Sequence, residues 1–404
     1  MLESVTPPLP LRMLNRAGAV LRSLGLPIVP LTPAALEARA VGQAGLSDFG
    51  EPDFEEPLAI LCRSAEEDAR LSFLGRMAVR DQITRALVTR LRRIDLRKRR
   101  PEIFTAPLTP PLIVLGLPRS GTTLLHRLLS LAPDARAIPM WQLQQPIPGP
   151  GPDRRREEAV AQVARIKKLA PEIDAKHHID ADEPEECVFL LDSSLMSASF
   201  WMFAPVYGYI AWFLDQDQRA AYRVYREHLQ ILQAETPGRR LTLKAPAHTP
   251  HLEALFAAIP EVMIVQTHRD PVDVVNSVNS LFHSVHGVVT EHVDTHRMGA
   301  VNLDLMADLV ERGLAARDKV PADRILDVRY GDLTRDPMGS VRRIHEHFGL
   351  PFEDAFAARL RHWLEHRPQD KFGRHVYAAE DFGMTDAQIA ERFKGYVARF
   401  GVSS

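Results

Sequence analysis

Residues 116–123, Gly-Leu-Pro-Arg-Ser-Gly-Thr-Thr, combine groups that can hold a tetrahedral anion. Glycines and a threonine fall at the positions of the phosphate-binding loop G-x-x-x-x-G-K-[ST], but Thr122 occupies the place of its lysine. A cation is present three residues earlier, at Arg119, whose guanidinium can donate two parallel hydrogen bonds to an oxyanion. Backbone amides at the start of a following helix would add further donors. The residues expected to bind the anion are Arg119, Ser120, Gly121, Thr122 and Thr123.

The missing lysine argues against a nucleoside triphosphate as the ligand. Kinases and NTPases combine that lysine with an acidic residue that holds magnesium. No predicted strand ends in a clear lone aspartate, since the best candidate ends in His268, Arg269 and Asp270. The sequence therefore favours a ligand with less charge to neutralise, such as a phosphosulfate. The alternatives are a P-loop kinase or NTPase with an atypical loop, and a non-catalytic nucleotide-binding protein of the same fold.

The elements that would position this loop alternate along the chain. Four short apolar segments predict strands, at 112–116, 241–246, 262–271 and 324–333. Helical patterns separate them, which predicts an α/β fold with a central, mainly parallel sheet flanked by helices. Residues 1–105 carry helical periodicity, and their basic run 90–102 is interpreted as a solvated helix end. We therefore expect an N-terminal helical region, followed by an α/β domain over 106–404.

In this strand–loop–helix context, the loop resembles the 5′-phosphosulfate-binding loop of sulfotransferases that use 3′-phosphoadenosine 5′-phosphosulfate (PAPS). Their loop ends in a Lys- or Arg-Ser-Gly-Thr-Thr core, which is 119–123 here. Segment 241–271 resembles the bacterial branch of this family, and 328–352 resembles the family's late strand-and-helix element, so the resemblance covers about residues 110–400. It implies a P-loop-like fold and in-line, metal-independent transfer of a sulfuryl group. The acceptor would be a hydroxyl or amine of a small molecule, lipid or carbohydrate, and 3′-phosphoadenosine 5′-phosphate (PAP) would be released.

Such an enzyme must also bind the 3′-phosphate of PAPS. An apolar strand ends at Arg269, a helix start follows, and Ser277 lies eight residues after Arg269, about two turns into that helix. If the helix folds back, the Ser277 hydroxyl faces Arg269, which resembles the family's 3′-phosphate motif. In animal members a later segment closes on the nucleotide, and Lys371 and Arg374 could do so here, or form an ordinary charged loop.

The general base is harder to place. Several relatives have a glutamate shortly after the first helix, but the matching position here is Gln142, which cannot accept the proton. The replacements within the cluster 176–191 are His178 and Glu183, and Glu186 could also serve if burial raised its pKa; the alternative is a solvated acidic helix start. Lys244, at a strand end near the loop, could stabilise developing charge beside Arg119, or could be a salt-bridged lysine.

Composition limits the other classes of function. A formal net charge of −2 gives no support to nucleic-acid binding, and two cysteines favour a reducing, cytoplasmic compartment. The apolar window 187–214 is interrupted by Asp192, Pro205 and serines, so no integral membrane span is expected. Its aromatic residues could line an apolar acceptor pocket or simply form core; they are Phe200, Trp201, Phe203, Tyr207, Tyr209 and Trp212. The N-terminal helices could cover this pocket or form a homo-oligomer contact.

Overall fold

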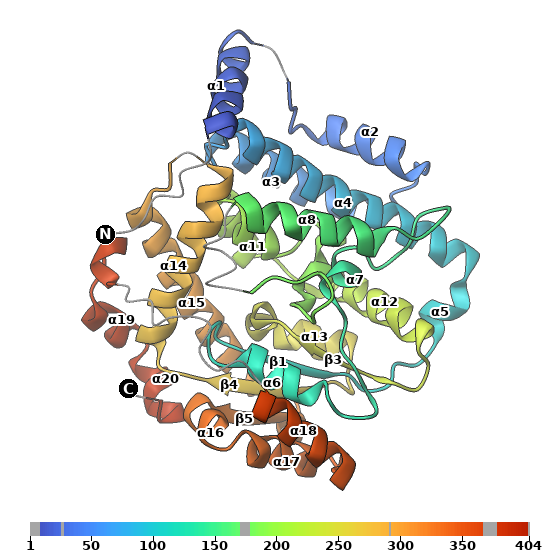
Figure 1. Cartoon of the computed structure of the whole chain (residues 1–404), viewed down its shortest axis with the longest axis vertical. Coiled ribbons are helices and arrows are strands. Elements are labelled where there is room, and N and C mark those ends of the chain that lie inside the picture. The colour runs from blue at the N-terminus through green and yellow to red at the C-terminus, as the bar shows by residue number, and fades with distance from the viewer. Residues whose placement is uncertain (1–8, 26–27, 170–177, 291, 367–377, 403–404) are drawn as a thin grey trace.

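The computed structural model describes residues 9–25, 28–169, 178–290, 292–366 and 378–402. Its centre is a five-stranded sheet in which every pair of neighbouring strands is parallel (Figure 1). In spatial order the strands are β2 (Ala135–Arg136), β3 (Arg240–Lys244), β1 (Leu112–Gly116), β4 (Met263–His268) and β5 (Ile325–Arg329). The expected α/β architecture is thus confirmed. Only β2 was not predicted, because two residues are too short to show a periodic pattern.

The three central strands are buried at every residue because both faces of the sheet are covered. On one face, Val114 and Val265 pack against the helices α6 and α17. On the other face, Ile113 and Leu243 pack against α12 and α13. The helices of these layers are α6 (Thr122–Leu129), α12 (Arg219–Glu235), α13 (Leu252–Ala258), α16 (Tyr330–Arg335), α17 (Pro337–His347) and α18 (Asp354–His366).

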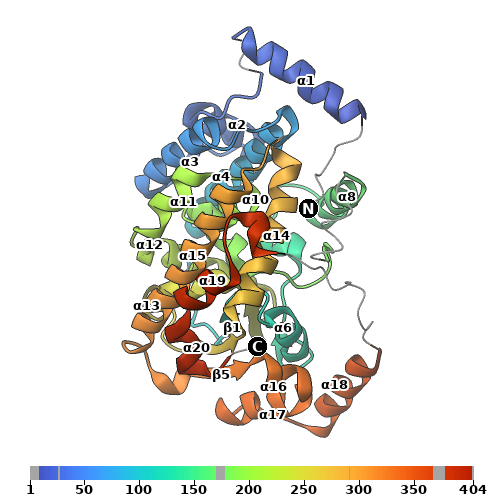
Figure 2. The same ribbon diagram turned by 90° about the vertical axis from the view of Figure 1, so that its left-hand side faces the viewer.

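The remaining helices lie above the sheet and along its left side in Figure 1, and Figure 2 shows α8 on the opposite side of the molecule from α2 and α3. Those before the sheet are α1 (Leu9–Ser23), α2 (Pro33–Ala44), α3 (Glu55–Glu67), α4 (Phe73–Arg99) and α5 (Pro101–Thr105). Those after β1 are α7 (Met140–Gln144), α8 (Arg155–Leu169), α10 (Ser199–Phe203), α11 (Tyr207–Leu214), α14 (Pro271–Val289), α15 (Thr295–Arg317), α19 (Asp386–Arg392) and α20 (Lys394–Phe400). Short 3₁₀ helices are η1 (Pro52–Phe54), η2 (Cys187–Ser194), η3 (Pro246–His251), η4 (Ala322–Arg324) and η5 (Ala379–Phe382).

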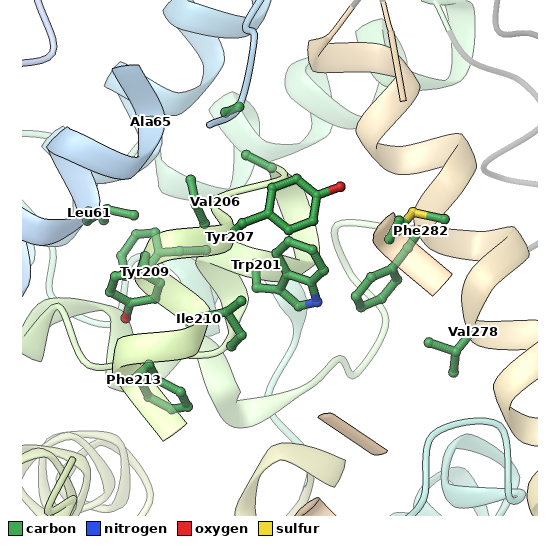
Figure 3. Close-up of a cluster of buried hydrophobic side chains, with 14 of the residues drawn as sticks. Leu61, Ala65, Trp201, Val206, Tyr207, Tyr209, Ile210, Phe213, Val278 and Phe282 are labelled. Atoms are coloured by element: carbon green, nitrogen blue, oxygen red, sulfur yellow. The ribbon is translucent and has the colours of Figure 1, made fainter. Parts of the chain in front are cut away.

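One apolar core joins the N-terminal helices to later parts of the chain. Leu61 and Ala65 of α3 belong to the same buried cluster as Trp201 of α10 and Phe282 of α14. Figure 3 shows the Trp201 ring between Tyr207 and Phe282, with ring centroids 5.1 and 6.3 Å away. The N-terminal helices therefore pack on the segment that carries most of the aromatic residues.

The basic run at the end of α4 is only partly solvated. Arg97 to Arg100 are exposed, as expected, but Arg90 and Arg93 are buried. Arg90 bonds the backbone of Glu51 and the carboxylate of Asp53, and Arg93 pairs with Glu227. The interpretation as a solvated helix end is therefore wrong for these two residues, because distant carboxylates that the local pattern does not reveal neutralise them.

Among the described residues, every helix is too short or too polar to cross a lipid bilayer.

Candidate active site

The loop after β1 requires glycine at two positions. Gly116 has φ 130°, and a Cβ there would lie 2.3 Å from the carbonyl oxygen of Thr267 on the neighbouring strand. Gly121 has φ 89°, and a Cβ there would lie 2.8 Å from the ring of Tyr330. No side chain fits either place. The two glycines therefore allow the loop to turn tightly between β1 and the start of α6 at Thr122.

The loop is held in a strained form between these glycines. Arg119 has φ 64°, a left-handed conformation that costs a non-glycine residue on the order of 1 kcal/mol or more. The adjacent hydroxyl of Ser120 is fully buried and bonds both the carbonyl of Leu117 and, at 2.6 Å, the hydroxyl of Thr267. Ser120 thus ties the loop to β4, and its hydroxyl is directed into the protein.

The three residues expected to bind the two phosphate ends lie together. The Nε of Arg119 donates to the Ser277 hydroxyl at 3.1 Å, and the Nη1 of Arg269 donates to the Arg119 carbonyl at 3.0 Å. They meet because β1 and β4 are parallel neighbours, whose carboxyl ends share one edge of the sheet. Ser277 therefore contacts Arg119 directly, and Arg269 joins the same cluster through the loop backbone.

Two residues that hold Arg269 were not singled out from the sequence. Its guanidinium carbon lies 4.5 Å from the centroid of the Tyr330 ring, and its Nη2 is 2.8 Å from the Asp273 carboxylate. Asp273 lies four residues after Arg269, in the first turn of α14, so this spacing could have indicated the pair. Tyr330 lies in the later segment that resembles the family, but its contact spans separate elements and leaves no local signal.

A cavity of about 1190 Å³ opens beside this cluster. Arg119, Thr122, Thr123 and Arg269 line one part of it. Apolar side chains of α4, α10, α14 and α15 line much of the rest, including Val79, Met202, Phe282 and Leu309. Of the six aromatic residues proposed for the acceptor pocket, Trp201 and Phe203 line this cavity, whereas Phe200 and Tyr209 pack against each other in the core.

Lys244 is buried beside two carboxylates that line the cavity. It is buried at the end of β3, and its Nζ is 3.2 Å from Glu185 and 3.0 Å from Glu186. Burial alone would lower the pKa of Lys244, but the carboxylates of Glu186 and Glu185 outweigh burial and raise that pKa above its ordinary value. The lysine is therefore a cation at neutral pH. Both glutamates line the same cavity as Thr122 and Thr123.

The two residues predicted as the general base, His178 and Glu183, lie close to each other. Glu183 forms an ion pair with Arg127 of α6, and the Nε2 of His178 lies 4.0 Å from the Glu183 carboxylate. Neither residue is among those that line the cavity. Gln142 is buried, accepts from Arg136 at 3.0 Å and donates to Glu235 at 2.5 Å, and it is not among the residues that line the cavity. Lys371 and Arg374 lie outside the described residues.

Two other histidines near the site have structural contacts. His248, two residues beyond the start of η3, is buried and contacts the Tyr222 hydroxyl at 2.7 Å and the Cys187 sulfur at 3.3 Å. Burial lowers the pKa of His248 to about 3, and that of His126 in α6 to about 4. These imidazoles are neutral across the physiological range, and their contacts fix the core beneath the cavity.

Comparison with known proteins identifies the family. A model described as "Sulfotransferase family" matches residues 110–354, which is more than half of the chain. The crystal structure of sulfotransferase STF9 from Mycobacterium avium is 31% identical, covers 92% of this chain and 97% of its own, and superposes with a TM-score of 0.83. This chain belongs to the sulfotransferase family. Sulfotransferase STF1 from Mycobacterium tuberculosis is 33% identical and covers 90% of this sulfotransferase and 98% of its own chain, with a TM-score of 0.75.

A further relative adds the name of an acceptor. The omega-hydroxy-beta-dihydromenaquinone-9 sulfotransferase Stf3 of Mycobacterium bovis is 25% identical over 311 residues, 71% of this chain and 75% of its own length. Family membership confirms the resemblance seen in the loop and favours sulfuryl transfer over the kinase and scaffold alternatives. This sulfotransferase is an enzyme that takes the sulfuryl group from PAPS and releases PAP.

Proposed function

We propose that this sulfotransferase sulfates a hydroxyl group on a long apolar molecule of lipid type. The observation that carries the proposal is the single cavity of about 1190 Å³ that joins the loop residues Thr122 and Thr123 to the apolar side chains of four helices. This volume exceeds the range of about 300–1,000 Å³ that is usual for small-molecule sites. The acceptor named for the relative Stf3, a hydroxylated menaquinone, belongs to the same chemical class.

In this proposal the donor site binds PAPS both at its phosphosulfate and at its 3′-phosphate. Arg119, Thr122, Thr123 and the backbone amides of 119–123 bind the phosphosulfate, while Arg269 with Ser277 binds the 3′-phosphate. The support is the cluster itself, in which the Arg119 and Arg269 side chains converge on one edge of the sheet. Ser120 contributes through its backbone, because its hydroxyl is bonded to β4. Lys371 and Arg374 remain predictions for a segment that closes over the nucleotide.

The base in this proposal comes from the pair Glu185 and Glu186. One carboxylate accepts the proton of the acceptor hydroxyl as the oxygen attacks sulfur, and the bond from sulfur to the bridging phosphate oxygen breaks, so that PAP leaves with the electron pair. Lys244 holds the pair in position and, with Arg119, offsets the negative charge that develops. His178 and Glu183 are the competing assignment. The support for Glu185 and Glu186 is that they line the cavity beside Thr122 and Thr123.

Cytoplasmic location is proposed on chemical grounds. The two cysteines, Cys62 and Cys187, are buried free thiols, and burial raises the pKa of each to about 12, which protects them from oxidation. An enzyme of this size without a disulfide is typical of a reducing compartment.

Acceptor preference can be measured with a series of primary alcohols of increasing chain length and radiolabelled PAPS. Each buried methylene is worth about 0.8 kcal/mol, so kcat/KM should rise about threefold to fourfold per methylene until the cavity is filled. A monosaccharide with a primary hydroxyl serves as the matched polar acceptor and should be a poor substrate. Equal rates along the series, or faster sulfation of the sugar, would contradict a lipid-type acceptor.

A further inference from the structure

Helix α1 exposes an unusually apolar face. Six large apolar side chains on or directly after this helix are between 39% and 70% exposed, and they are Leu9, Met13, Leu14, Val20, Leu21 and Leu24. At 100° per residue they occupy one side of the helix, with Leu9, Met13 and Val20 on nearly the same line. Outside this helix and the adjoining Ile28, the only other large apolar side chain with comparable exposure in the described part of the chain is Val160 of α8.

The opposite side of α1 is fixed to the body of the protein. The Asn15 side chain is buried and accepts a hydrogen bond from the backbone amide of Leu74 at 3.1 Å. Gly18 lies so close to Phe73 that a Cβ at this position would be 2.5 Å from its side chain. Because α4 holds α1 by this side, the apolar face is directed away from the protein.

The charges of α1 are all of one sign. Residues 9–23 contain no aspartate or glutamate, and Arg12 and Arg16 are exposed along the border of the apolar face. An apolar face bordered by arginines is the arrangement that lies in the plane of a bilayer surface, with the apolar side chains between the lipids and the guanidinium groups among anionic headgroups. A second apolar helix on this face would offer these arginines no anionic partner.

The position of α1 relates this face to the catalytic cavity. The helix stands at one end of the molecule, beyond α2 and α4, in both views (Figures 1 and 2). Asn15 of α1 and Leu74 of α4 line the same cavity that reaches the donor loop. A bilayer that contacts α1 would therefore adjoin the end of the cavity opposite the donor site.

We propose that α1 is a membrane-docking helix that places this sulfotransferase on the surface of an anionic lipid bilayer. The binding itself is independent of the acceptor. The consequence that an acceptor could pass from the bilayer into the cavity rests on the proposed function.

The test measures co-sedimentation of the full-length protein with phosphatidylcholine vesicles that contain roughly 30% phosphatidylglycerol. Val20→Glu should reduce the partition coefficient by about tenfold or more, because a carboxylate replaces an apolar group inside the interface. Val160→Glu is the matched control: its side chain is 44% exposed on α8, and the variant should bind as the wild type does. Arg12→Gln with Arg16→Gln should weaken binding about tenfold at low salt, whereas Arg63→Gln on the exposed surface of α3 should not.

The outcomes are distinct. No vesicle binding by the wild type, or equal loss in Val20→Glu and Val160→Glu, would overturn the proposal. If light scattering shows a dimer that Val20→Glu converts to a monomer, and vesicles do not bind, the face belongs to a second copy of the chain and the proposal is wrong. PAP affinity, measured on the same samples by calorimetry, should be equal in all variants. If the wild type does not bind PAP, the proposed function is contradicted, and the vesicle result is unaffected.

Discussion

Replacing Arg119 with alanine should lower kcat by about 10²- to 10³-fold, the usual cost of removing one donor that stabilises developing negative charge. Arg119 lies on the loop that lines the cavity, with its Nε on Ser277. Alanine is also unfavourable at φ 64°, so a loss of activity could come from the backbone alone. Arg119→Gly separates the two causes, since glycine adopts this conformation without strain. Steady-state kinetics should show a similar loss for both variants.

Arg269→Ala is the comparison that separates binding from chemistry. The guanidinium of Arg269 lies beside the loop backbone and the Tyr330 ring, where we place the 3′-phosphate. Loss of a charge-assisted bond should raise the Kd of PAP about tenfold to a hundredfold, with a smaller effect on kcat at saturating PAPS. Full activity in both Arg119→Gly and Arg269→Ala would show that the donor site lies elsewhere.

Replacing the base with its amide should have an effect of similar size. We expect one of the variants Glu185→Gln and Glu186→Gln to lose about 10²- to 10⁴-fold in kcat, because glutamine cannot accept the proton of the attacking hydroxyl. The other should lose less, since it still hydrogen-bonds Lys244. PAP affinity, measured by calorimetry, should be unchanged in both variants.

Glu183→Gln and His178→Asn are the matched controls for that experiment. Glu183 pairs with Arg127 and is 40% exposed at its side chain, and His178 is 36% exposed, so each should lose less than about tenfold if both act outside the cavity. A larger loss in either control than in both Glu185→Gln and Glu186→Gln would assign the base to that control residue instead.

The donor loop could be predicted because its geometry is local. Two glycines, an arginine between them and a helix start in eight residues define both the turn and the donors, and the structure places Gly116 and Gly121 where no other residue fits. The strands β1, β3, β4 and β5 were also visible, since each contains several apolar residues within a short segment. Neither feature needs contacts from distant parts of the chain.

Lys244 and Glu186 were each visible as candidates, but their pairing with each other and with Glu185 could not be predicted, because it depends on such contacts. Lys244 and Glu186 are 58 residues apart, and the turn that directs Glu185 and Glu186 inward and Glu183 outward has no periodic pattern. For the same reason the buried arginines of α4 looked solvated. No sequence motif indicated that α4 lines the cavity, although its residues Val79 and Arg85 do so.

We propose that one cluster, at the edge of the sheet between β1 and β4, binds both ends of the nucleotide. The most direct test of this central claim is a crystal structure with PAP, prepared in the presence of a chelator. We predict density for the 5′-phosphate within hydrogen-bonding distance of the amides of 119–123, and for the 3′-phosphate beside Arg269 and Ser277. Density for PAP at any other place, or calorimetry that detects no uptake of PAP, would contradict the account.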